Sequence, residues 1–146
     1  MLKKLLERLK ESEPEREENL VALAAATLFL EVAWADHDLQ EEELTVARNA
    51  LKFVLGIDDA EVDILMDHSL ERLDAAVGMQ AFTRELVNAW SLEQRFALLV
   101  QLWKLALADQ QIDRYEEATI RKIAELLYVP HARFIEARRI ARDESG

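Results

Sequence analysis

The sequence contains no cysteine and only three glycines and two prolines among its 146 residues. The absence of cysteine excludes disulfides, thiolate nucleophiles and cysteine-type zinc sites, and it leads us to expect a cytoplasmic protein. The scarcity of glycine and proline leaves few turn residues, while 51% hydrophobic and 32% charged residues indicate long periodic segments. We therefore predict an all-α fold in a single domain, which a chain of this length can build around one core.

Basic residues are also few in comparison with acidic ones. The chain has 18 Lys and Arg against 29 Asp and Glu, a formal net charge of −11. Affinity for nucleic acid comes largely from basic side chains that displace counterions, so we expect no nucleic-acid partner. The first ten residues lack the apolar segment of a signal peptide, in keeping with a cytoplasmic location.

Motifs of known catalytic chemistry are missing as well. There is no Gly-rich phosphate loop, no Gly-x-Ser-x-Gly elbow and no His-Glu-x-x-His zinc motif. A di-iron Glu-x-x-His motif would need Glu three residues before a histidine, and none of the three histidines has one. The sequence therefore predicts a protein that is not an enzyme.

Two segments are apolar almost all round. Between Leu20 and Ala35 only Thr27 and Glu31 are not apolar, and residues 92–108 form a second segment of this kind. Such helices are buried on nearly all sides, and sixteen residues fall short of the roughly 20 that a transmembrane helix needs. Apolar periodicity and capping residues predict further helices, which gives a compact bundle of seven or eight helices: 41–54, 58–72, 75–89, 114–127 and a last one from Pro130.

The N-terminal segment differs from the rest in its charge pattern. Leucines at helical spacing in residues 2–10 alternate with basic residues, and an acidic stretch follows at 11–18. We expect an N-terminal amphipathic helix and acidic linker over residues 1–13 and the helical domain over residues 14–142, with a frayed tail at 142–146. The leucines suit packing on the domain or on a partner chain, and peripheral membrane contact is the less favoured alternative.

One stretch of the sequence occurs twice. Residues 33–43 and 106–116 both read Ala-x-Ala-Asp, with an aliphatic residue three places after the Asp and a Glu seven places after it. The two copies are 73 positions apart, and residues 55–57 correspond to residues 127–129 after a deletion of one residue. The repeat predicts an internal pseudo-twofold helix-loop-helix duplication in which the two apolar helices pack on each other.

Each copy carries three carboxylates that could hold a metal: Asp36, Asp38 and Glu43 in the first, and Asp109, Asp113 and Glu116 in the second. Carboxylates are the hard oxygen ligands that calcium, magnesium and manganese prefer. Calcium takes about 6–8 oxygens, so a site would need backbone carbonyls and water, or both loops together. These six residues are the candidate metal ligands.

A second interpretation treats the same acids as helix caps. Asp113 and Glu116 have the spacing of a capping box, and Glu43 lies in a first helical turn, where an acid stabilises the helix by about 0.3–1 kcal/mol. Capping does not account for Asp36 and Asp109, which lie at the unfavourable end of a helix dipole. The two interpretations lead to different functions, a cation-binding module or a protein-protein scaffold without metal.

Two charged residues interrupt the apolar helices at matched positions. Glu31 and Lys104 are 73 positions apart and carry opposite charge. Burying either one alone would cost several kcal/mol, so we expect them to compensate one another or Glu31 to turn toward the acidic loops.

The doubled motif resembles the TerB-like family, named for tellurite resistance protein B. The resemblance rests on Leu30-Glu31-Val32-Ala33-Trp34-Ala35-Asp36 with Glu43, and on residues 102–109 with Glu116 and residues 126–129. It implies a compact all-helical fold with pseudo-twofold character, acidic residues proposed to bind a divalent metal, and a role in stress response without established catalysis. The family usually has Gly directly after the Asp, where this chain has His37 and Gln110, so these loops are expected to differ in shape.

Basic residues concentrate near the C-terminus. The last predicted helix carries four arginines, at positions 133, 138, 139 and 142. Such a strip is usually a solvated face, but in an acidic chain it also suits an acidic protein partner or a second copy in a homodimer.

Overall fold

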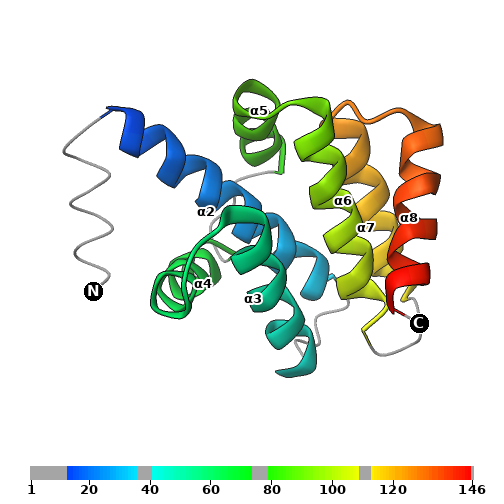
Figure 1. Ribbon diagram of the computed structural model, residues 1–146, viewed down its shortest axis with the longest axis horizontal. Coiled ribbons are helices and arrows are strands. Elements are labelled where there is room, and N and C mark those ends of the chain that lie inside the picture. Colours follow the sequence, from blue (N-terminus) through cyan, green and yellow to red (C-terminus); the bar gives the residue numbers. More distant parts are fainter. Residues whose placement is uncertain (1–12, 36–40, 74–78, 109–112, 146) are drawn as a thin grey trace.

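Seven helices make up the described part of the chain. The computed structural model describes residues 13–35, 41–73, 79–108 and 113–145, and these ranges contain no strand. The helices are α2 (Glu13–Ala33), α3 (Glu41–Leu55), α4 (Asp59–Leu73), α5 (Met79–Ala89), α6 (Leu92–Ala106), α7 (Arg114–Leu126) and α8 (His131–Ser145), as shown in Figure 1. The predicted all-α fold is confirmed.

Most helix boundaries lie within a few residues of the predicted ones. Ser91 caps α6 in a reciprocal capping box with Gln94, and Asp58 with Glu61 opens α4 in the same way. α2 begins at Glu13 within the acidic stretch and carries Pro14 in its first turn, a position that suits proline because a missing N–H costs nothing there. The predicted helix at 2–10 lies outside the described residues.

The predicted fraying of the C-terminal tail is wrong for residues 142–145, because α8 continues to Ser145. Two contacts explain this. Ala141 is fully buried, and Glu144 forms an ion pair with Lys104 of α6. The last turn of α8 is thus attached to the core through both its apolar and its charged side.

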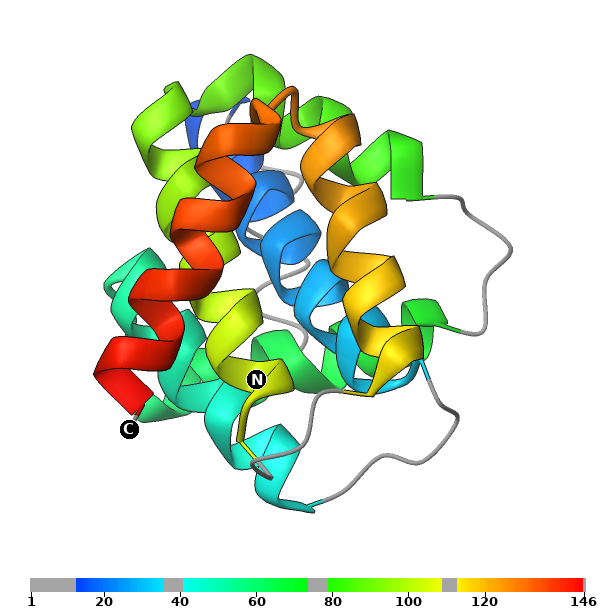
Figure 2. The same ribbon diagram turned by 90° about the vertical axis from the view of Figure 1, so that its right-hand side faces the viewer.

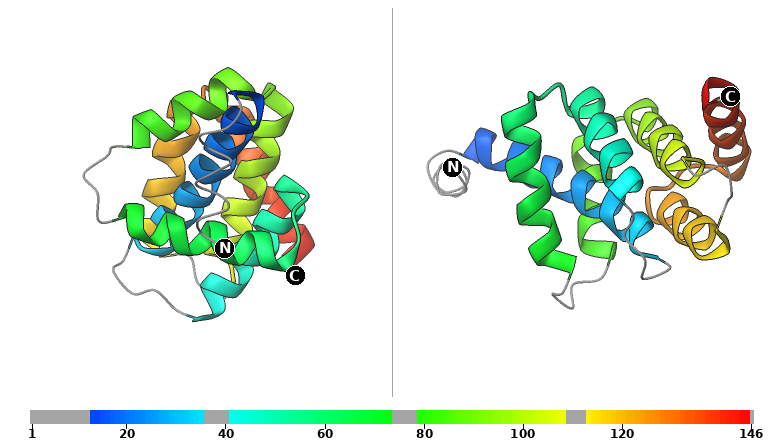
Figure 3. Two further views of the ribbon diagram at one scale, coloured as in Figure 1. Left: turned by 90° about the vertical axis from the view of Figure 1, so that its left-hand side faces the viewer. Right: turned by 90° about the horizontal axis from the view of Figure 1, so that it is seen from below.

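The two apolar helices form the centre of the domain. α2 packs on α3, α4, α5, α6 and α7, and α6 packs on α2, α3, α5, α7 and α8. Small residues at 24–27 precede large ones at 28–30 in α2, and residues from Ala24 to Ala33 other than Glu31 are at most 1% exposed. Viewed from below, α4 and α8 lie at opposite ends of the molecule, with α3 and α6 between them (Figure 3).

Helix boundaries repeat at the offset that the sequence predicts. α2 and α6 end 73 positions apart, α3 and α7 begin 73 positions apart, and both ends of α4 and α8 differ by 72. The contacts repeat too, because α2–α4 corresponds to α6–α8, and α3–α6 corresponds to α7–α2. These correspondences support the duplication. The pseudo-twofold rotation itself stays a prediction, which superposing α2–α4 on α6–α8 would test.

The turn that ends α3 recurs at the end of α7. Gly56 has a φ of 65° and Tyr128 a φ of 55°, both in the left-handed region. In each turn the next residue donates its N–H five residues back, Ile57 to the Lys52 carbonyl at 3.3 Å and Val129 to the Ala124 carbonyl at 3.0 Å. This is the closing bond of a Schellman cap. The second copy has kept the geometry with a tyrosine in place of glycine.

No helix among the described residues is both long and apolar enough to cross a membrane.

Candidate functional site

The two acidic loops begin and end at the same end of the molecule. Figure 2 shows the last turns of α2 and α6 and the first turns of α3 and α7 gathered at its lower side. The sequence predicted this gathering, because each loop joins one apolar helix to the amphipathic helix that follows it. The candidate site is therefore the end of the bundle at which these four helix termini lie.

α2 and α6 end in the same hydrogen-bonded turn. The N–H of Trp34 donates to the Leu30 carbonyl at 2.8 Å, and the matched N–H of Leu107 donates to the Trp103 carbonyl at 2.9 Å. One residue later, Ala35 and Ala108 each donate to a carbonyl three residues back at 3.2 Å. Both acidic loops thus leave the core from an equivalent backbone position.

Glu43 and Glu116 are buried at matched positions. Their side chains are 5% and 2% exposed, and no other charged side chain in the described ranges is buried to this degree. Each lies in the first turn of its helix, α3 or α7, where the helix dipole favours a negative charge. Both make contacts within the protein, and their burial shields each carboxylate from water.

The burial of these two glutamates was not predicted, although both were candidate ligands. Their periodicity contains the signal, because Glu43 stands four residues before buried Ala47, and Glu116 four residues before buried Ile120. Residues four apart share one face of a helix, and this face is the one turned to the core. An acid on a core-facing stripe is therefore the feature that sequence inspection could have detected.

Asp113 acts as a helix cap. Its Oδ1 accepts the N–H of Tyr115 at 2.6 Å and the N–H of Glu116 at 3.4 Å, at the start of α7. The capping interpretation thus accounts for Asp113 without a cation. It is the one candidate ligand for which the described contacts supply a full structural role.

The remaining candidates, Asp36, Asp38 and Asp109, lie outside the described residues, as do His37 and Gln110. Within the described ranges no three acidic or histidine side chains converge to hold a metal ion. Glu43, Asp113 and Glu116 therefore do not form a metal site by themselves.

The charges that interrupt the two apolar helices have different environments. Lys104 pairs with Glu144 of α8, whereas the described contacts give Glu31 no ion pair. Glu31 and Lys104 therefore form no ion pair with each other, and the alternative, that Glu31 turns toward the acidic loops, stays a prediction. Partial burial of Glu31 in the last turns of α2 raises the pKa of its carboxyl above the ordinary value of 4.5.

The sequence matches a known family over most of its length. Residues 22–139 match the family described as Tellurite resistance protein TerB, a range that includes both copies of the repeated unit. No curated protein and no solved structure gives a match. The chain belongs to the TerB family, and the resemblance drawn from the doubled motif is confirmed.

Proposed function

We propose that this member of the TerB family is a non-catalytic stress-response module that binds a divalent cation, calcium, magnesium or manganese. The cation would bind where α2 and α6 end and α3 and α7 begin. Its ligands would come from Asp36, Asp38 and Glu43 and from Asp109, Asp113 and Glu116.

One observation carries the proposal, the matched burial of Glu43 and Glu116 beside the two acidic loops. Placing a carboxylate away from water is costly unless it meets a compensating charge or hydrogen bonds. The helix dipole supplies part of this compensation, and a cation held by the neighbouring loop acids would supply more. That both copies have kept a buried acid at this position favours a shared role over two unrelated caps.

Charge and ligand type select the class of cation. All six candidates offer carboxylate oxygen, the donor that calcium, magnesium and manganese prefer over softer ligands. The protein carries a net charge of −11, so a divalent ion would also relieve repulsion among the loop acids.

The test is thermal unfolding of chelator-treated protein in the presence of each cation. At 100 times its dissociation constant, an ion bound at one site stabilises the fold by about 2.7 kcal/mol. For a domain of this size, this amounts to a rise in Tm of roughly 5–10 °C. Isothermal titration with the same ions gives the number of sites.

Variants separate ligation from capping. Asp36→Asn and Asp109→Asn should abolish the cation-dependent rise in Tm. Asp113→Asn is more informative, because Asn caps a helix about as well as Asp but lacks the charge. If Asp113 is a ligand, this variant keeps its Tm in chelator and loses part of the gain with cation. Glu85→Gln, an exposed acid on α5, is the matched control and should retain the full gain.

An unchanged Tm in calcium, magnesium, manganese and chelator would refute cation binding. The six acids would then be caps and surface charge, and the scaffold interpretation would replace the proposal.

A further inference from the structure

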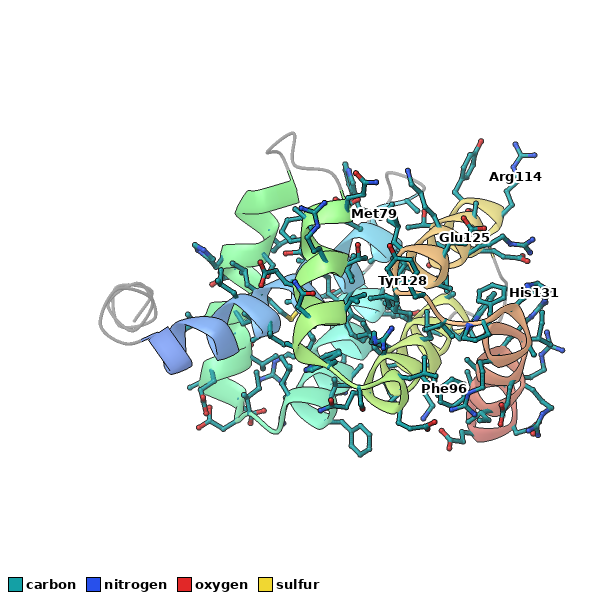
Figure 4. The ribbon with its side chains drawn as sticks, turned by 90° about the horizontal axis from the view of Figure 1, so that it is seen from above. Met79, Phe96, Arg114, Glu125, Tyr128 and His131 are labelled. Carbon is teal, nitrogen blue, oxygen red and sulfur yellow. The ribbon has the colours of Figure 1, made fainter. Side chains whose placement is uncertain are left out.

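The outer surface between α7 and α8 is built differently from the rest of the molecule. Both helices pack on α6, but they do not form a packed pair with each other. We call this surface the α7–α8 seam and define it by Arg121, His131, Phe134, Ile135 and Arg138. Figure 4 shows α7 and α8 at the side of the molecule remote from the start of α2, with His131 labelled at the beginning of α8.

Neighbouring aromatic rings, tilted against one another, form the floor of the seam. The rings of Trp103 and Phe134 are buried, with centroids 5.4 Å apart, and the ring of His131 lies 5.9 Å from that of Phe134. Two guanidinium groups lie over this floor, Arg121 at 5.6 Å from the Phe134 centroid and Arg138 at 5.4 Å from the Trp103 centroid. A guanidinium over an aromatic ring is attracted to the ring face and can still donate N–H groups to an anion.

These cations are weakly neutralised by their surroundings. Among the described residues, Arg121 forms an ion pair only with Glu117, one turn earlier on its own helix, at 3.5 Å. Arg138 makes no ion pair with a described residue, and its buried Nε–H has no acceptor among them. Arg142, one turn beyond Arg138 on α8, also lacks an ion pair in the described part of the chain.

The first half of the molecule shows how such a surface is neutralised. Arg48 of α3 is at the position that matches Arg121. Its Nε–H donates to Oδ1 of Asp63 at 2.8 Å, and its Nη2 lies 3.2 Å from Oδ1 of Asp59, both acids being on α4. At the positions in α8 that match these two acids, 72 residues later, the chain has His131 and Ile135. Ile135 is 46% exposed. Where the first half has two carboxylates of its own, the second half has a histidine and an exposed aliphatic side chain.

We propose that the α7–α8 seam is a docking site for an acidic segment of a partner protein. Carboxylates of that segment would take the places that Asp59 and Asp63 hold in the first half and pair with Arg121 and Arg138. An apolar side chain of the segment would cover Ile135. Charge-assisted contacts to arginine around an apolar anchor are a common way in which proteins recognise acidic motifs.

Charge favours an acidic peptide over nucleic acid as the partner. Residues 113–146 contain seven basic and seven acidic residues, and the rest of the chain is strongly acidic. A polyphosphate would meet this acidic surface beyond the few cations of the seam, whereas a short peptide needs only the seam itself.

Fluorescence anisotropy with a labelled peptide of about twelve residues, composed of Glu and Leu in a helical pattern, tests the proposal. The full chain should bind this peptide, and binding should weaken as salt is raised. Arg121→Gln and Arg138→Gln should each lower the affinity about tenfold, the usual effect of losing a hydrogen bond to a charged group. Arg48→Gln changes the same residue type at the matched position and should leave the affinity unchanged.

A second variant does not depend on removing a stacked side chain. Ile135→Asp places a carboxylate where the first half has Asp63, so it should neutralise Arg121 and abolish peptide binding without lowering Tm. Ile135→Asn has the same size without the charge and should reduce the affinity less.

Three outcomes would overturn the proposal. The first is that the protein does not bind the peptide at low salt. The second is that Arg48→Gln lowers the affinity for the peptide as much as Arg121→Gln does. The third is that heparin or anionic lipid vesicles bind more tightly than the peptide and that their binding also depends on Arg121 and Arg138. Analytical ultracentrifugation of the chain alone adds a fourth. A dimer that Ile135→Asp dissociates would mean that a second copy occupies the seam.

Discussion

The two halves of the molecule share a backbone plan, but the contacts between the last two helices of each half differ. In the first half, Arg48 and Lys52 of α3 form ion pairs with Asp59 and Asp63 of α4 at the surface. In the second half, no ion pair joins the described residues of α7 and α8, and Arg121 of α7 lies over the Phe134 ring of α8 instead. α8 is attached to α6 by the ion pairs Lys104–Glu144 and Arg133–Glu93 and by arginines that lie over aromatic rings, including Arg133, whose guanidinium lies 3.8 Å from the Phe96 ring centroid. Helix order and turns are thus alike in the two halves, while the side chains between the helices differ.

The two kinds of attachment respond differently to pH. A hydrogen bond from Lys52 lowers the pKa of Asp59, and one from Arg48 lowers the pKa of Asp63, both from an ordinary value of 3.8. A lowered carboxyl pKa contributes stability at pH values above 3.8, and this contribution is lost as the pH falls through the lowered pKa. Both acids are exposed, so the contribution is small and screened by salt. The contacts of Arg121 with Phe134 and of Arg138 with Trp103 involve no carboxyl, although the ion pairs between α6 and α8 do.

The largest expected effect on stability comes from replacing Trp103 of the second half by leucine, the residue at the matched position in the first half. Trp103 is fully buried and matches Leu30 of α2. We expect Trp103→Leu to destabilise the fold by about 3 kcal/mol, because it leaves a cavity beside Phe134 and removes the ring on which Arg138 lies. This corresponds to a fall in Tm of roughly 6–12 °C in thermal unfolding.

The reverse exchange is the control. Leu30→Trp overfills a closed core and should cost about 1–3 kcal/mol. If both exchanges leave the free energy of unfolding unchanged, the two halves are interchangeable and the comparison fails.

Sequence alone predicts the parts of this structure that depend on local spacing. Helix starts at Asp58 and Ser91 follow from capping residues, and the central position of α2 and α6 follows from their apolar surfaces. The aromatic floor of the seam could not be predicted in this way, because Trp103 and Phe134 are 31 positions apart and meet only through tertiary packing. For the candidate site, the cap at Asp113 was predicted, whereas the burial of Glu43 and Glu116 depends on which helix face meets the core.

The matched turns after α3 and α7 predict an intermediate effect. No atom lies within 4 Å of a Cβ built at Gly56, so Gly56→Ala would meet only the backbone cost of the left-handed conformation. That cost is about 1–2 kcal/mol. Tyr128→Gly should relieve the same strain, offset by the roughly 0.5–1 kcal/mol that glycine loses in chain entropy, for a net gain of up to about 1 kcal/mol.

Denaturant unfolding of both variants measures these changes. Tyr128 is 75% exposed, so its replacement removes few packing contacts that could mask the gain. A loss of stability in Tyr128→Gly comparable to that in Gly56→Ala would show that the tyrosine is not strained at this position.

The smallest expected effect concerns the matched charges Glu31 and Lys104. Burial raises the folded-state pKa of Glu31 above 4.5, so its ionised form is disfavoured in the fold. The wild type therefore loses stability as the pH rises from 4.5 through the raised pKa, and Glu31→Gln avoids this loss. In chelator-treated protein we expect Glu31→Gln to raise Tm slightly at pH 7, with the difference vanishing below pH 4.5. The gain is small because the side chain is only partly buried and water screens the charge.

Lys104→Gln should instead lower Tm at pH 7, since it breaks the ion pair with Glu144. Equal and pH-independent shifts in the two variants would show that position 31 is no more desolvated than position 104, and the difference between the halves would then be confined to their outer helices.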